Sequence, residues 1–170
     1  MEILKIATDW VKAEVFSSLF FVFFWIVFVF ASLGFWQLGK TELAKAYIIP
    51  TLIAGVLFLI IWLGLIYSYQ SKINNFPISY NNDSKKFVET EIIYVEKTLN
   101  DYKNTVFTAI PIIIAICAIL LIFISTPIWK SSLITIIAFL AILLLVDGTA
   151  SNRLENYYKQ LKLIESQELN

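Results

Sequence analysis

The stretch from Ile128 to Ile164, IWKSSLITIIAFLAILLLVDGTASNRLENYYKQLKLI, changes character at a single acidic residue. Before Asp147 the chain is almost wholly apolar, and after it polar and charged residues separate apolar residues that recur every three or four positions. An apolar run of about 20 residues has the length of a transmembrane helix. The segment after Asp147 instead has the periodicity of an amphipathic helix. The stretch therefore predicts one helix that crosses a membrane and continues into water.

Three further apolar runs have a similar length, and apolar residues make up 59% of the 170-residue chain. A soluble protein has roughly 45–50%. Water is absent from the core of a bilayer, so each run must satisfy its own backbone as a helix. We therefore predict an all-α integral membrane protein with a single domain over residues 1–170. Its four transmembrane helices are expected at about 15–38, 47–69, 106–125 and 128–147.

The basic residues are unequally divided among the segments between the spans. Two precede the first span, five lie in the central loop and three in the tail, whereas the two short loops together hold three. Segments rich in lysine and arginine stay on the cytoplasmic side of a membrane. We therefore expect a multi-pass protein of a bacterial cytoplasmic membrane, with both termini and the central loop in the cytoplasm.

Two seams of apolar residues, spaced alternately by four and three, extend the third and fourth spans beyond the lipid bilayer. The first seam begins near Ser84 and the second ends near Ser166. Such spacing places the side chains on one face of a helix. Helices joined by a short turn are neighbours. We therefore expect 84–105 and 148–166 to form an antiparallel cytoplasmic stalk. Its seam residues are Val88, Ile92, Val95, Leu99, Tyr102, Ala150, Leu154, Tyr157, Leu161 and Ile164.

The connections carry their own signals. The segment Gln70–Ser84, rich in asparagine and serine and interrupted by a proline, is predicted to be irregular. Gly39 is expected to end the first helix and Thr41 to cap the next. Pro127 suits the first position of the fourth helix. Two small residues four apart, Thr51 and Gly55, permit close helix contact within the chain or between chains.

Several charged residues are expected at the inner edge of the membrane. Asp147 follows Trp129 by 18 residues, which is about 27 Å along a helix and close to the thickness of the hydrocarbon core. If the last two helices pair about the Pro127 turn, Lys103 lies about one turn from Asp147. The expected cluster is Glu14, Asp101, Lys103, Asp147 and Arg153, with Asp101 opposite Arg153.

Two interpretations of Asp147 stay open from the sequence. It can be a carboxylate in the headgroup zone, either hydrated or paired. Alternatively, it can face a water-filled cavity on an ion or proton path, since ionisable groups inside membranes are often functional.

Other features limit the function. The chain has no histidine and one cysteine, Cys117, and its 13 basic and 13 acidic residues cancel. We therefore expect no metal site, no cofactor and no nucleic-acid partner. The motifs of hydrolases and nucleotide-binding enzymes are missing from the sequence, so we do not expect an enzyme.

Two function classes remain. The first is a structural or interaction subunit or scaffold, whose helical hairpin packs on itself or docks a cytoplasmic protein partner or another copy. The alternative is an oligomeric channel or a transporter of ions or small solutes, with its path between protomers.

Overall fold

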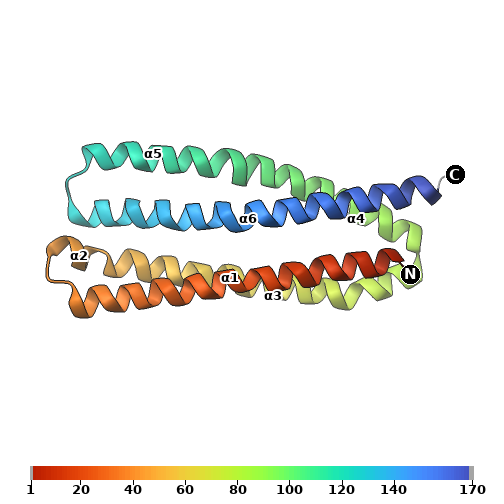
Figure 1. Cartoon of the computed structure of the whole chain (residues 1–170), viewed down its shortest axis with the longest axis horizontal. Helices are drawn as coiled ribbons and strands as arrows, with labels where there is room; N and C mark the ends of the chain where they lie inside the picture. Colours follow the sequence, from red (N-terminus) through yellow and green to blue (C-terminus); the bar gives the residue numbers. More distant parts are fainter. Residues whose placement is uncertain (1, 169–170) are drawn as a thin grey trace.

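The computed structural model describes residues 2–168, with side chains for 2–166, and its elements in that range are all helices. They are α1 (Glu2–Leu38), α2 (Glu42–Ala46), α3 (Ile48–Asn82), α4 (Ser84–Asp101), η1 (Tyr102–Ala109), α5 (Ile110–Phe123) and α6 (Pro127–Glu168). Because α4, η1 and α5 are continuous, four long segments form the bundle (Figure 1). Within residues 2–168, four helices are long and apolar enough to cross a membrane. The prediction of an all-helical chain with four such helices is confirmed.

The four segments lie side by side along the length of the molecule (Figure 1). The connections at 39–47 and 124–126 lie at one end, and the described ends of the chain lie toward the other, as does the turn at Asp83. We call the part near the first two connections the apolar half. The polar half is the remainder, formed by residues 2–14, 70–82, 84–105 and 148–166.

The turns of the apolar half follow the sequence signals. Thr41 Oγ1 accepts a hydrogen bond from the Ala44 N–H at 3.1 Å and caps α2. The Gly39 N–H donates to the Phe35 carbonyl at 3.0 Å. A Cβ atom at Gly39 would overlap that carbonyl oxygen, so only glycine fits at the end of α1. Pro127 is the first residue of α6, as predicted.

Small residues hold the helices together in the apolar half. A Cβ atom at Gly55 would lie 3.3 Å from a methyl group of Val29, which shows how closely α1 approaches α3. The Ser131 hydroxyl donates to the Ala46 carbonyl at 2.8 Å. Pro50 has no N–H with which to bind that carbonyl. The serine therefore satisfies an acceptor that the proline would leave free within the apolar half.

The prediction of an irregular segment at Gln70–Ser84 is wrong, because α3 continues to Asn82. Asp83 alone separates α3 from α4, and its Oδ1 accepts the Lys86 N–H at 3.0 Å. Pro77 lies within the helix with its side chain exposed. Tertiary packing overrides the weak helix propensity of this polar segment, because Phe76 is buried against α4.

The third long segment contains a stretch of π-helix, η1. The Ile110 N–H donates to the Thr105 carbonyl, five residues back, and the Thr108 hydroxyl donates to the Lys103 carbonyl at 2.8 Å. Pro111 follows and lacks an N–H of its own. Wider turns change the phase of the helix, so the seam of α4 does not continue in register along α5.

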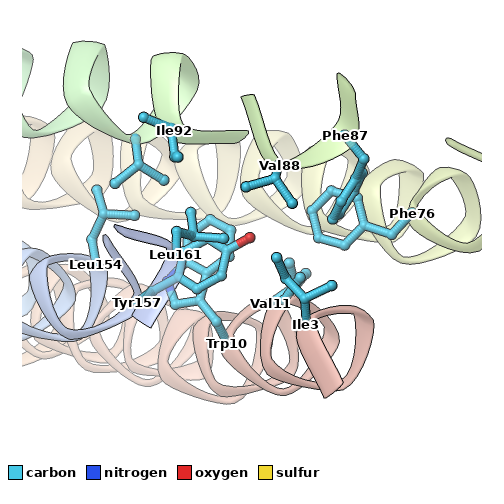
Figure 2. Packing of buried hydrophobic residues seen from close by; sticks show 12 residues of the cluster. Ile3, Trp10, Val11, Phe76, Phe87, Val88, Ile92, Leu154, Tyr157 and Leu161 are labelled. Carbon is cyan, nitrogen blue, oxygen red and sulfur yellow. The ribbon is translucent and has the colours of Figure 1, made fainter. Parts of the chain in front are cut away.

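The polar half has a core to which every long segment contributes. Ile3, Trp10 and Val11 of α1 and Phe76 of α3 meet the apolar faces of α4 and α6 (Figure 2). The remaining buried members are Ala7, Phe87, Val88, Ile92, Val95, Leu154, Tyr157 and Leu161. The expectation of a two-helix hairpin in this region is therefore incomplete, because α1 and α3 cover it.

Candidate functional site

A partly buried ion pair joins α1 to α6 where the two halves meet. Arg153 Nε donates to Glu14 Oε1 at 2.8 Å, and Arg153 Nη2 donates to Glu14 Oε2 at 3.1 Å. The Glu14 side chain is 6% exposed and that of Arg153 is 30% exposed. A bidentate arginine–carboxylate pair of this kind is stronger than a single neutral hydrogen bond. The hydrogen bonds with Glu14 also raise the pKa of Arg153.

Asp147 lines a small cavity beside this ion pair. The cavity has a volume of about 30 Å³ and is also lined by Glu14, Tyr69 and Tyr102. Such a space holds about one or two water molecules. Asp147 is half-buried and forms no hydrogen bond or ion pair with another residue of the described chain. It therefore faces a confined polar space, and Lys103, which we expected about one turn away, does not pair with it within the described residues.

The other two members of the expected cluster lie outside it. Asp101 and Lys103 are both exposed, and neither forms an ion pair within the described residues. Arg153 binds Glu14 instead of Asp101. The expected pairings considered only the third and fourth helices, whereas α6 also packs on α1. The structure therefore brings Glu14, Asp147 and Arg153 together and leaves the other two at the surface.

All ten seam residues face the interior of the polar half. Buried seam residues are Val88, Ile92, Val95, Ala150, Leu154, Tyr157 and Leu161. Leu99, Tyr102 and Ile164 are partly buried and pack against the same core.

A second polar site was not expected from the sequence. The Lys72 ammonium lies over the Tyr94 ring, 3.2 Å from its centroid, and within 5.1 Å of the Trp10 ring and 5.7 Å of the Phe76 ring. Aromatic faces attract a cation through their quadrupole. However, they supply no hydrogen-bond acceptor, and the Lys72 nitrogen is shielded from solvent and has no hydrogen-bond partner among the residues that the structure describes.

The Lys72 cage, defined by Lys72, Trp10, Phe76 and Tyr94, continues into a buried carboxylate. Glu91 Oε2 accepts a hydrogen bond from the Tyr157 hydroxyl at 3.2 Å. The Tyr157 ring stacks on Trp10 with 4.7 Å between centroids, and the two side chains lie together in Figure 2. Burial raises the pKa of Glu91, whereas the nearby charge of Lys72 lowers it.

Burial also destabilises the charged form of Lys72 relative to its neutral form. It lowers the pKa of Lys72 to about 8, and the nearby charge of Glu91 only partly offsets this effect. A titratable group that is shifted this far beside a cavity is a candidate for function.

A groove between α3 and α4 leads to the Lys72 cage. Its volume is about 590 Å³, within the range of small-molecule sites. Lys72, Glu91 and Tyr94 line it toward the centre of the bundle, and Asp83 and Lys86 line it near the turn. The other lining residues are Ser71, Asn75, Phe76, Ser79, Asn82, Phe87 and Thr90.

One signal in the sequence could have revealed this site. Tyr69, Ile73, Phe76 and Tyr80 are spaced by four, three and four residues. All four pack on the core of the polar half. The pattern indicates a helix through the segment that we predicted to be irregular, and Lys72 lies on that helix. The approach of Trp10 and Tyr94 to Lys72 has no such local signal.

No protein-family model, no curated protein and no solved structure matches this chain. The geometry itself offers two polar sites on one helical bundle. One is the Glu14–Arg153 pair with the cavity at Asp147. The other is the Lys72 cage with its groove.

Proposed function

We propose that this chain is a structural or interaction subunit, in which four transmembrane helices anchor a preformed cytoplasmic helical bundle that docks a protein partner. The observation that carries the proposal is the closed core of the polar half, where both seams are buried together with side chains of α1 and α3. A close-packed core keeps its surface in one arrangement, which suits a docking module.

The proposed stalk consists of α4 and the end of α6, packed antiparallel and joined to the third and fourth spans. Two side-chain contacts support it. The Tyr158 hydroxyl donates to Glu96 at 2.6 Å, and the Tyr157 hydroxyl donates to Glu91 at 3.2 Å. The orientation with both termini in the cytoplasm rests on the excess of lysine and arginine in the polar half.

The packing of the apolar half favours an anchor over a conduction path within one copy. Phe58 is fully buried there. Its ring lies between 4.6 and 6.1 Å from those of Phe21, Phe24, Phe28 and Phe139, measured between centroids. Phenylalanine rings fill a large volume and carry no hydrogen-bonding group that could replace the water around an ion. Many large apolar side chains on the outside of this half are exposed, as lipid contact requires.

A second candidate function is an oligomeric channel or transporter. The observation that favours it is Asp147, which lines the small cavity and has no ion-pair or hydrogen-bond partner in the described part of the chain. A carboxylate in such a place can bind a proton or a cation. In this alternative the path runs between protomers.

The test of the proposal combines two measurements on the full chain. The protein mass of the complex purified in mild detergent should exceed that of the 19.5-kDa chain by the mass of a partner protein bound in a fixed ratio. Liposomes that contain the purified protein should show no flux of protons or small cations above that of empty liposomes. A flux that disappears in Asp147→Asn would overturn the proposal in favour of the second candidate.

A further inference from the structure

The charges that line the α3–α4 groove are not equally satisfied. Asp83 accepts the Lys86 N–H, and Glu91 accepts the Tyr157 hydroxyl. By contrast, the ammonium groups of Lys72 and Lys86 donate no hydrogen bond and form no ion pair within the described residues. The groove therefore has unused cationic donors, while each of its carboxylates already has a donor.

Lys72 is the more costly of the two cations to leave unsatisfied. A buried ammonium without hydrogen bonds loses hydration that aromatic faces restore only in part. Lys86 is exposed and remains hydrated. A ligand with oxygen acceptors supplies the hydrogen bonds that the Lys72 ammonium lacks in its cage. We therefore expect Lys72 to contribute more to binding than Lys86.

We propose that the α3–α4 groove binds a ligand through a phosphate group, which draws the Lys72 ammonium out of its aromatic cage and into the groove. Lysine is a common phosphate-binding residue because its ammonium is a compact charge with three donors. Its flexible stem lets the nitrogen leave the Tyr94 face without movement of α3.

The position of the second lysine suggests the length of the ligand. Lys72 lies opposite Tyr94 across the groove, and Lys86 precedes Tyr94 by eight residues. Eight residues of helix correspond to about 12 Å. A soluble ligand that contacts both lysines therefore extends from Lys72 toward Lys86, past the hydroxyl and amide groups of Ser79 and Asn75.

Two sources can supply the phosphate. Lys72 follows Tyr69, where the second span is expected to end, by three residues, or about 4.5 Å, so the headgroup of an anionic lipid can reach it. A soluble phosphate compound can instead enter near the Asp83 turn. The shared chemistry is the phosphate, and the experiment separates the sources.

The experiment uses the detergent-solubilised full chain, titrated with sodium pyrophosphate at constant ionic strength. Fluorescence is the signal, because withdrawal of Lys72 changes the surroundings of Trp10, and Trp10→Phe removes that part of the signal. In parallel, nanodiscs of phosphatidylglycerol are compared with nanodiscs of phosphatidylcholine. Saturation by pyrophosphate indicates a soluble ligand. A fluorescence change only in phosphatidylglycerol indicates the lipid.

Three variants test the site. Lys72→Met should weaken binding by about tenfold or more, because it removes a charge-assisted hydrogen bond. Glu91→Gln should strengthen binding, because it removes a negative charge that acts on Lys72 and lines the same groove. Lys85→Met is the matched control, since Lys85 is exposed and does not line the groove. It should bind like the parent chain.

The parent chain and Glu91→Gln keep the test decisive even if Lys72→Met does not fold. A parent chain that responds to neither pyrophosphate nor phosphatidylglycerol overturns the proposal. So does binding that Lys72→Met leaves unchanged, or binding that Glu91→Gln weakens without loss of folded protein.

Discussion

Arg153 and Glu14, which are 139 residues apart in the chain, form a bidentate ion pair with hydrogen bonds of 2.8 and 3.1 Å. The pair lies where the apolar half meets the polar half. Because the Glu14 side chain is only 6% exposed, its charge depends on Arg153 for compensation.

Arg153→Met should destabilise the protein more than the double variant Glu14→Gln, Arg153→Met does. The single change leaves a buried carboxylate unpaired, which costs about 2–3 kcal/mol, below the roughly 3–5 kcal/mol for a fully buried pair because the arginine is partly exposed. The double change leaves no uncompensated charge. Equilibrium unfolding in detergent measures both. Equal losses in the two variants would show that Glu14 does not need the arginine.

Asp147→Asn should be tolerated. The carboxylate has no partner within the described chain and lies beside Glu14 at the small cavity, so loss of its charge removes no attraction. The free energy of unfolding should change by at most about 1 kcal/mol. Thermal unfolding of the solubilised variant provides the check. A much larger loss of stability would indicate a buried partner for Asp147.

Leu154→Ala should weaken the core of the polar half. Leu154 is 2% exposed, and truncation of a packed leucine costs about 2–5 kcal/mol. Hydrogen exchange should accelerate together in residues 84–101 and 150–166. Leu163→Ala is the control on the same helix, because Leu163 is 62% exposed. Faster exchange at the end of α6 alone would contradict a shared core.

Leu99→Ala should have a smaller effect than Leu154→Ala, since Leu99 is only partly buried.

Stability should increase with pH between about 8 and 10. Burial lowers the pKa of Lys72 from 10.5 to about 8. Between these values the unfolded chain binds more protons at this site than the folded chain, and stability therefore rises with pH. Burial raises the pKa values of Tyr94 and Tyr157, so above pH 10 the folded chain holds protons that the unfolded chain loses, and stability falls.

Unfolding of the parent chain and of Lys72→Met across this pH range tests the assignment. The variant should lose the rise between pH 8 and 10. Lys86→Met should keep it, because Lys86 is exposed. A rise that persists in Lys72→Met would assign it to another group.

The parts of the fold that were predicted correctly have a strong local signal. The apolar runs are long, and the two seams keep their four-and-three spacing throughout, so the buried faces of α4 and α6 follow from the sequence. The continuation of α3 through Pro77 was missed because asparagine, serine and proline favour turns in isolation. Packing of Phe76 against α4 compensates for this preference.

The candidate sites were harder to predict because they are made by helices that are distant in the sequence. Glu14 and Arg153 were both placed at the membrane edge, but pairing them requires knowing that α1 lies against α6. Lys72 meets Trp10 from α1 and Tyr94 from α4. No spacing within a single helix specifies such contacts, and π-helix η1 changes the phase between the seam and α5.

The most direct test of the central claim, a membrane anchor with a cytoplasmic bundle, is cysteine labelling in intact cells. In a Cys117→Ala background, single cysteines replace Lys40 or Thr126, which are exposed at the apolar end, or Asn81 at the polar end. Ser131 is unsuitable because it is fully buried. A membrane-impermeant maleimide should label positions 40 and 126 from outside, and position 81 only after the cells are opened. Labelling of position 81 in intact cells, with positions 40 and 126 protected, would contradict the proposed orientation and the cytoplasmic bundle with it.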